Sequence, residues 1–356
     1  MSDLLLKTES PLDGLTPPVL AWYRANARDL PWRKTSDPYR IWVSEIMLQQ
    51  TRVAAVLGYY ARFLDAFPAV GDLASAPEDL LLKLWEGLGY YSRARNLQKA
   101  ARIVRDSGRF PDSFAELLKL PGVGEYTAAA IASAAFGIPE AAVDGNVLRV
   151  AARLTDCHDD ISDPAVKKRI RGWVQDVFPD SGADIRIFNQ ALMELGAVVC
   201  VPNGPPKCLL CPARERCLAF ARGTFDALPV KKAKKPRRVE EKTVFVLLLE
   251  GRAALRKRPD SGLLAGLWEF PNTDGVLDED AAAEVLRSWG LEPKSWRKRL
   301  TAKHLFTHVE WRMTGYVLEV SGNADFFWTP SLDACAVPSA FAKFSKEALA
   351  LLGGAP

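Results

Sequence analysis

Four cysteines lie close together in the pattern Cys200-x7-Cys208-x2-Cys211-x5-Cys217. The chain has 356 residues but only three histidines, so a centre built from several histidines is excluded. Four thiolates on one loop suit a tetrahedral metal centre, and zinc and a [4Fe–4S] cluster both accept them. Zinc sites more often pair two Cys-x-x-Cys knuckles across a longer gap, so one knuckle between two single cysteines favours the cluster. The loop 200–217 is therefore expected to be pinned by a metal centre.

The chain before residue 225 is predicted to be helical. Apolar residues recur at helical spacing between prolines and glycines, and strand-like alternation is nearly absent. We therefore expect an all-α domain over residues 1–225. Its predicted helices are Ile41–Leu57, Pro77–Trp85, Ala94–Asp106, Phe114–Leu120, Glu125–Phe136, Val147–Leu154, Pro164–Phe178 and Ile185–Val198.

A basic run separates this domain from a second one. Six of the eight residues Lys231–Arg238 are Lys or Arg and one is Pro, so we expect a solvated linker over 226–241 that can also touch phosphate. The remaining residues, 242–356, are predicted to form a smaller α+β domain. Its signals are β-rich runs at Thr243–Glu250, Ala253–Arg258 and Arg312–Val320 and a helical stretch at Glu279–Ser288.

The composition is that of an ordinary globular protein. Hydrophobic residues make up 48% and charged residues 25%, and the net charge of +4 is compatible with nucleic acid without being diagnostic of it. No apolar run approaches the roughly 18 residues of a membrane span, and the N-terminus lacks the basic flank of a signal peptide. We expect a soluble, cytoplasmic protein with no membrane partner.

A glycine-containing hairpin is predicted at Leu120-Pro-Gly-Val-Gly-Glu-Tyr-Thr, between two helical segments. Gly122 and Gly124 allow a tight turn and leave N–H groups free at the start of the next helix. Together with the helix dipole, such groups bind phosphate. An ordinary helix–turn–helix connection would also use glycine, so the motif alone is only moderately specific.

Two carboxylates stand out. Glu45 has Ile41, Trp42 and Leu48 as its helical neighbours, so we expect desolvation to raise its pKa toward that of a general acid, unless it reaches solvent at the helix rim. Asp144 precedes a helical run and is predicted to be its N-cap, whose hydrogen bonds favour the ionised form. One acid pushed toward protonation and one held as an anion would suit cleavage of a glycosidic bond.

In combination, these segments resemble the helix–hairpin–helix DNA glycosylases. The hairpin LPGVGEYTAA, the aspartate of VDGNV and the four-cysteine loop carry the resemblance, and SEIMLQQT with the C-terminal extension narrows it to the adenine-specific, MutY-type family. The resemblance covers nearly the whole chain. It implies removal of adenine paired with 8-oxoguanine or guanine in double-stranded DNA, by a monomeric base-excision-repair hydrolase that holds a [4Fe–4S] cluster and acts at the bacterial nucleoid.

The resemblance also implies a role for individual residues. Glu45 corresponds to the general acid and Asp144 to the carboxylate that stabilises the oxocarbenium-like intermediate. Tyr126 stands where bifunctional relatives hold a lysine nucleophile, so strand cleavage should be weak. Gly122, Val123 and Gly124 would hold the DNA backbone, and Cys200, Cys208, Cys211 and Cys217 the cluster. The substrate-binding set is Arg28, Trp32, Arg33, Leu48, Gln50, Thr51, Tyr90, Asn146 and Glu194.

The C-terminal part resembles the Nudix-like 8-oxoguanine reader of that family. Its segment Phe306, Thr307 and His308 matches the loop that probes the damaged base, with a threonine where serine is frequent. Acids at 279, 280 and 284 do not make the dense Arg-Glu-x-x-Glu-Glu cluster of a Nudix hydrolase. The cysteine pattern departs from the family in one respect, because its first spacer has seven residues where the family has six.

Other functions stay open on the residues alone. A bifunctional glycosylase/lyase for oxidised pyrimidines is disfavoured by Tyr126. A non-catalytic, cluster-bearing DNA-binding protein and a Nudix-type nucleotide hydrolase are further alternatives. Single residues also have ordinary explanations: Trp32 and Leu48 as core, Tyr90 as a surface aromatic.

Overall fold

The computed structural model describes residues 10–180, 182–232 and 236–353. The chain folds into two compact units. The first lies within residues 1–74 and 96–233, and the second within 75–95 and 234–356. No helix of the described residues is long and apolar enough to cross a membrane.

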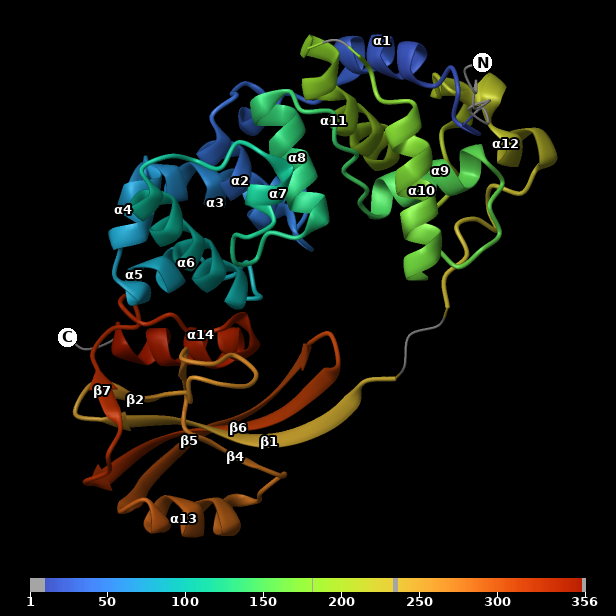
Figure 1. Ribbon diagram of the computed structural model, residues 1–356. Helices are drawn as coiled ribbons and strands as arrows, with labels where there is room; N and C mark the ends of the chain where they lie inside the picture. Colours follow the sequence, from blue (N-terminus) through green and yellow to red (C-terminus); the bar gives the residue numbers. More distant parts are fainter. Residues whose placement is uncertain (1–9, 181, 233–235, 354–356) are drawn as a thin grey trace, which may run out of the picture. The chain divides into compact units, whose positions relative to one another are not determined.

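The first unit is built of helices, as predicted (Figure 1). Most predicted helices are found within a few residues of their expected bounds. The elements are α1 (Thr16–Asn26), η1 (Pro31–Arg33), α2 (Pro38–Leu48), α3 (Val53–Ala66), α4 (Val70–Ser75), α6 (Ser92–Ser107), α7 (Phe114–Leu117), α8 (Glu125–Phe136), α9 (Gly145–Leu154), α10 (Pro164–Asp176), α11 (Gly182–Val198), η2 (Cys208–Leu210), η3 (Arg214–Arg216) and α12 (Leu218–Arg222).

The prediction of one helix over Ile41–Leu57 is wrong, because the chain breaks between α2 and α3. Asp37 caps the start of α2 by accepting a hydrogen bond from Tyr39 N, and Gln49 ends the helix. Gln50 then adopts a left-handed backbone with φ of 61°. Helical periodicity continues across the break, so the pattern of apolar residues could not reveal it.

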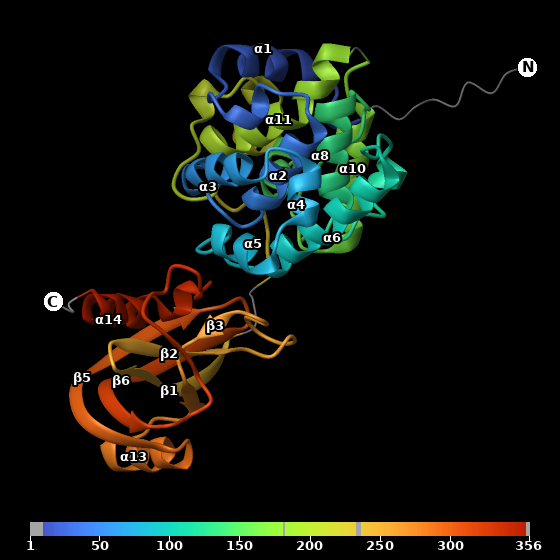
Figure 2. The same ribbon diagram turned by 90° about the vertical axis from the view of Figure 1, so that its left-hand side faces the viewer.

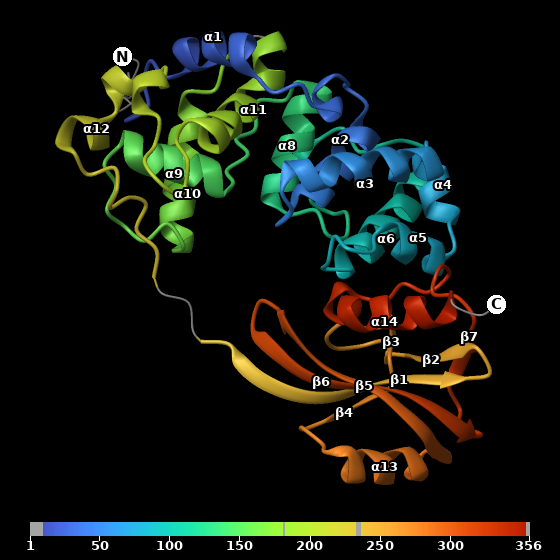
Figure 3. The same ribbon diagram turned by 180° about the vertical axis from the view of Figure 1, so that it is seen from behind.

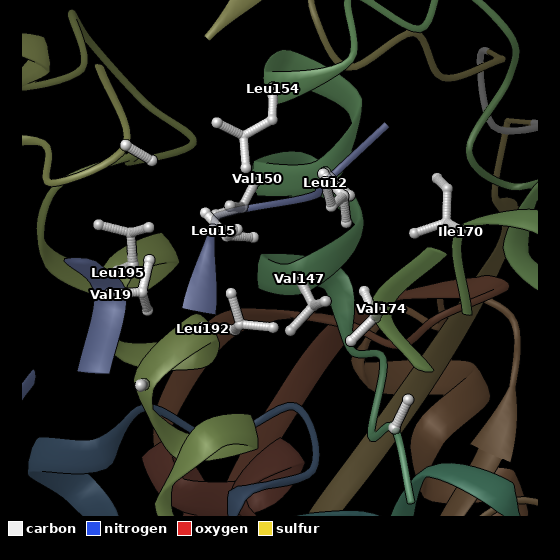
Figure 4. Close-up of a cluster of buried hydrophobic side chains, with 14 of the residues drawn as sticks. Leu12, Leu15, Val19, Val147, Val150, Leu154, Ile170, Val174, Leu192 and Leu195 are labelled. Atoms are coloured by element: carbon white, nitrogen blue, oxygen red, sulfur yellow. The ribbon is translucent and has the colours of Figure 1, made fainter. Parts of the chain in front are cut away.

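The largest core of this unit joins helices from both ends of its sequence. Figure 4 shows Leu12, Leu15 and Val19 from the N-terminal segment packed with side chains of α9, α10 and α11. Val147, Val150 and Leu154 point from one face of α9 into this cluster. The core therefore fixes α9 and α11 against each other.

The hairpin between α7 and α8 has the predicted geometry. Gly122 has a φ of 78°, and a Cβ there would lie 2.8 Å from Asn96 Cβ, so only glycine fits. Gly124 is the N-cap of α8, and Val123 is buried beneath the turn. The N–H groups of the first turn of α8 are thereby left at the surface of the hairpin.

The second unit is built on a mixed seven-stranded sheet. Five strands follow the order β3-β2-β1-β6-β5, while β4 pairs with β1 and β7 with β2. Figures 2 and 3 show α13 and α14 on opposite faces of this sheet. The elements are α5 (Glu78–Leu84), β1 (Arg238–Leu249), β2 (Arg252–Lys257), β3 (Trp268–Glu269), β4 (Asn272–Asp274), α13 (Glu279–Ser288), β5 (Leu291–Leu305), β6 (Val309–Gly322), β7 (Phe327–Thr329), η4 (Ser339–Phe341) and α14 (Ala342–Leu352).

Burial on both faces explains the apolar run in β1. Val244, Val246 and Leu248 face the core beneath α14, whereas Phe245 and Leu247 face the core beneath α13. The helix α13 has the predicted bounds. The long edge strand β5 was missed, because most of its side chains are exposed and its sequence lacks apolar alternation.

Candidate active site

A cleft of about 630 Å³ opens in the first unit. That volume is within the usual range for a small-molecule site. The segment around η1, the C-terminal end of α2, the first turn of α8, the start of α9 and one face of α11 form its walls. It is lined by eight predicted catalytic or pocket residues, Arg28, Trp32, Arg33, Glu45, Leu48, Tyr126, Asp144 and Glu194, and also by Gln50, Thr51 and Asn146.

Glu45 lies in the cleft wall on α2. Burial raises its pKa to about 7, although the hydrogen bond from Tyr126 opposes the shift, and the charge of Asp144 adds to it. The predicted direction is confirmed. Tyr126 Oη donates to Glu45 Oε2 over 2.8 Å, so in the neutral acid the proton belongs on the other oxygen, Oε1.

Asp144 caps α9, as predicted. Its Oδ1 accepts hydrogen bonds from the backbone N–H groups of Asn146 (2.9 Å) and Val147 (2.8 Å), and its Oδ2 accepts one from Asn146 Nδ2 (2.7 Å). The expectation that these bonds hold its pKa low is wrong. Desolvation by burial outweighs them and raises the pKa of Asp144 above its usual value.

Close packing of α11 against α9 fixes this cap. A Cβ at Gly196 would lie 2.6 Å from Asn146 Cβ and 3.1 Å from its Cα, so no larger residue fits there without displacing α9. Arg149 then ties the helices together by donating from Nη2 to Asn146 Oδ1 and Gly196 O, both over 2.8 Å. Its Nε donates to Cys200 O over 2.8 Å, which connects the cysteine loop to the same helix end.

A carboxylate clamped by two arginines forms another wall. Glu194 on α11 is fully buried and accepts hydrogen bonds of 2.7 Å from Arg28 Nε, Arg28 Nη2 and Arg33 Nη2. Burial disfavours its charge, but these bonds outweigh that effect and lower the pKa of Glu194 to about 2. Glu194 is therefore an anion at every pH at which the protein is expected to work. Trp32, packed edge-on against Tyr60, and Leu48 add apolar surface.

The two residues predicted to enter the base stack share an unusual backbone. Gln50 at the cleft has a φ of 61°, and Tyr90, which follows α5 in the second unit, has a φ of 47° and is 45% exposed. A left-handed conformation is unfavourable for residues other than glycine and is frequent at functional sites. Their side chains are thus presented at turns and not packed into a core.

The four cysteines of the loop 200–217 line one small apolar cavity of about 30 Å³ beside α9 and α11, so the longer first spacer does not separate Cys200 from the others. Arg153 Nη1 donates to Cys200 Sγ over 3.2 Å. Among the described residues, no group of three or more His, Cys, Asp or Glu is arranged to hold a metal ion. Four thiols around one cavity are donors of the kind that soft metals accept.

In the second unit, Phe306, Thr307 and His308 form the turn between β5 and β6. Phe306 packs against Trp311 at 4.9 Å between ring centroids, and its backbone O accepts a hydrogen bond from Arg237 Nε. Thr307 and His308 are exposed at the tip. The turn therefore presents an imidazole on a fixed aromatic base, while the Thr307 hydroxyl shares a hydrogen bond of 2.8 Å with Tyr90 Oη.

The sequence analysis missed several residues of the site. Gln190 and Met193 line the cleft from α11, and Met193 Sδ lies 3.4 Å from Tyr126 Oη. Gln190 precedes Glu194 by one helical turn, so its spacing could have indicated it. Arg149 gave no signal, because its partners come from separate parts of the chain.

Residues 43–176 match the HhH-GPD superfamily base excision DNA repair protein family, and residues 243–347 match the NUDIX domain. Among solved structures, a thermostable thymine-DNA glycosylase is 31% identical, with a TM-score of 0.51 over 58% of this chain and 95% of that one. The helical unit therefore has the helix–hairpin–helix glycosylase fold and the C-terminal part a Nudix-like fold.

Curated relatives extend over both parts. The adenine DNA glycosylase of Homo sapiens is 36% identical over 88% of this chain and 68% of its own length. The enzyme of the same name from Buchnera aphidicola subsp. Baizongia pistaciae is 35% identical over 84% of this chain and 83% of its own length. This chain belongs to the adenine DNA glycosylase family, base-excision-repair hydrolases that cut the N-glycosidic bond of adenine in DNA.

Proposed function

We propose that the cleft between α2, α8, α9 and α11 is the adenine pocket of this enzyme, and that its substrate is adenine paired with 8-oxoguanine or guanine. The observation that carries the proposal is the meeting of Glu45 and Asp144 in one cleft of suitable volume. Adenine in a duplex cannot reach such a cleft, so it must be extruded, at a cost of a few kcal/mol. Gln50, Thr51 and Tyr90 are proposed to offset this cost at the gap in the stack, and Gly122, Val123 and Gly124 to hold the backbone.

Glu45 is proposed to protonate the leaving base. With a pKa of about 7, about half of this carboxyl is protonated at pH 7, and the group can transfer its proton readily. A purine leaves more easily once its N7 carries a proton, because negative charge no longer develops on the ring. After transfer, the carboxylate can orient a water molecule toward the sugar, with Tyr126 still donating to Oε2.

Asp144 is proposed to stabilise the positive charge that grows on the deoxyribose. Burial disfavours its anion. A cationic sugar beside it offsets that penalty, because an opposite charge at short range stabilises the anion. Tyr126 offers a phenol and no amine, so a Schiff base cannot form there. The alternative of a bifunctional glycosylase/lyase for oxidised pyrimidines is therefore not favoured.

Cys200, Cys208, Cys211 and Cys217 are proposed to hold a [4Fe–4S] cluster. Such a cluster would rigidify the loop 200–217 and, through Arg149 and Arg153, brace the end of α9. The proposed role is structural and needs no redox step.

The C-terminal domain, which follows the catalytic domain proposed at 1–225, is proposed to read the base opposite adenine. The proposed linker begins at 226 and ends before Arg238, where β1 starts. Adenine itself is undamaged, so the signal for removal has to come from its partner. We propose Phe306, Thr307 and His308 as the reading turn, and a monomer that acts at the nucleoid in the cytoplasm.

Glu45→Gln is expected to slow release of adenine from a duplex containing an A:8-oxoguanine pair by about 10²- to 10⁴-fold, because an amide cannot donate the proton. Binding of the duplex should change little. Single-turnover base release and a fluorescence binding titration measure the two quantities. Asp65→Asn, an acid-to-amide change at an exposed position of α3, is the matched control. Near-normal rates for Glu45→Gln would exclude Glu45 as the acid and the cleft as the active site.

The single-turnover rate is expected to fall about tenfold per pH unit above pH 7, as Glu45 loses its proton. Because the pKa of Asp144 is raised, the acidic limb should lie above the usual range of an aspartate. A profile flat from pH 6 to 9 would contradict the assignment.

The raised pKa of Glu45 also makes the stability of the folded protein depend on pH. The folded protein binds the Glu45 proton more tightly than the unfolded chain, in which the pKa of this glutamate is near 4.5. Glu45 therefore contributes its full stabilisation below pH 4.5, and this contribution is lost as the pH rises through 7. The loss is at most about 3 kcal/mol. Glu45→Gln should therefore melt at a higher temperature than the native protein at pH 8 and not at pH 4.

Iron and acid-labile sulfide are expected in equal amounts in the purified protein, with visible absorbance that Cys208→Ser or Cys211→Ser largely removes. Metal analysis and absorption spectroscopy measure this. Cys157→Ser is the control, because Cys157 is buried beside Asp159 and does not line the cavity of the four cysteines. Stoichiometric zinc in a colourless protein would overturn the cluster.

Thr307→Ala is expected to lower the preference for A:8-oxoguanine over A:G by about 3- to 10-fold, the worth of one or two hydrogen bonds. The ratio of single-turnover rates on the two duplexes measures this. Thr301→Ala, at an exposed position of β5, should leave the ratio unchanged. An unaltered ratio for both Thr307→Ala and His308→Ala would reject the reading turn.

A further inference from the structure

Tyr23 on α1 lies behind the cleft wall and touches two residues that line it. Its side chain is buried, with 6% of the residue exposed. The hydroxyl donates to Gln190 Oε1 over 2.7 Å. The guanidinium of Arg33 stands over the ring, 5.4 Å from its centroid. Tyr23 is not itself among the lining residues, so any effect on the substrate must pass through Gln190 or Arg33.

The phenol determines which way the Gln190 amide points. Burial raises the pKa of Tyr23, so its hydroxyl keeps the proton and needs an acceptor. Oε1 of Gln190 is that acceptor, and Tyr23 has no other acceptor among the described residues. With the amide reversed, Nε2 would donate to the phenol oxygen and the buried phenolic hydrogen would be left without a partner, which is costly. The favourable arrangement leaves the two Nε2 hydrogens for the cleft.

The aromatic ring supports the second contact. Arg33 Nη2 donates to Glu194 Oε2 over 2.7 Å, and Nη1 donates to Arg28 O over 3.1 Å. A cation over an aromatic face adds attraction where water is partly excluded. The ring and the hydroxyl of Tyr23 therefore act on different pocket groups, and the two effects can be separated by substitution.

An amide held in one orientation as a hydrogen-bond donor can distinguish adenine from a 6-oxopurine. Adenine offers ring nitrogens that accept hydrogen bonds, whereas a 6-oxopurine such as hypoxanthine carries an N–H at N1. If the Gln190 amide faces N1, a donor that cannot turn over pairs with N1 of adenine and is left unpaired against the N1–H of hypoxanthine. An amide free to turn over would present its oxygen to that N–H and lose the distinction.

We propose that Tyr23 is a positioning residue that sets the purine specificity of the cleft by holding the Gln190 amide as a hydrogen-bond donor. The inference rests on the proposed assignment of this cleft as the adenine pocket.

The test is a double-mutant cycle read by single-turnover release from duplexes with adenine or hypoxanthine opposite 8-oxoguanine. Tyr23→Phe keeps the ring beneath Arg33 and removes only the hydroxyl. It is expected to slow adenine release about 3- to 10-fold and to lower the adenine-to-hypoxanthine ratio. In a Gln190→Leu background the same change should cost less than about twofold, because the amide it orients is gone.

Tyr39→Phe is the matched control. Tyr39 is also buried and donates to a backbone oxygen, Phe67 O, over 2.9 Å, away from the cleft. It should lower the melting temperature without changing the ratio. Equal slowing by Tyr23→Phe in both backgrounds, or an unchanged ratio, would overturn the inference and leave Tyr23 a merely structural residue. Failure of the pocket assignment looks different, because Glu45→Gln and Gln190→Leu would then both keep the native rate.

Discussion

The contact between α11 and the start of α9 is the constraint on which the site depends. At Gly196 the two helices approach so closely that a single added carbon would collide with Asn146. This approach places the Asp144 cap, the Glu194 clamp and the Gln190 amide around one cleft. It also lets one arginine, Arg149, reach Asn146, Gly196 and Cys200 together. A shift of either helix would disturb all of these groups at once.

Burial raises the pKa of all three carboxyl groups of the cleft, and their partners decide the outcome. The pKa of Glu45 rises to about 7, while that of Glu194, which is fully buried, is held near 2 by two arginines. Asp144 lies between these cases, since its three hydrogen bonds favour the anion but do not overcome desolvation. One cavity thus offers a proton donor, a permanent anion and a second carboxyl group whose anion a neighbouring cation would stabilise. Glycoside chemistry needs this separation of protonation states.

The cleft is completed from behind by residues that never face it. Tyr23 contacts Gln190 and Arg33, and Arg149 contacts Asn146 beside the Asp144 cap. Such supporting contacts decide how freely a pocket group can turn, and so how sharply it discriminates between ligands. Their residues come from α1 and α9, which are far apart in the helical unit's sequence.

The sequence by itself determined the local chemistry. Periodicity and turn residues predicted most helices, the Gly122–Gly124 hairpin, the Asp144 cap and the apolar neighbours that raise the pKa of Glu45, because each depends on residues within one or two turns. Only the tertiary structure decided the break after Leu48, the raised pKa of Asp144 and the roles of Gln190 and Arg149. The reason is that burial and pairing arise between segments far apart in sequence, as between Arg28 and Glu194, 166 positions away, and no local pattern encodes them.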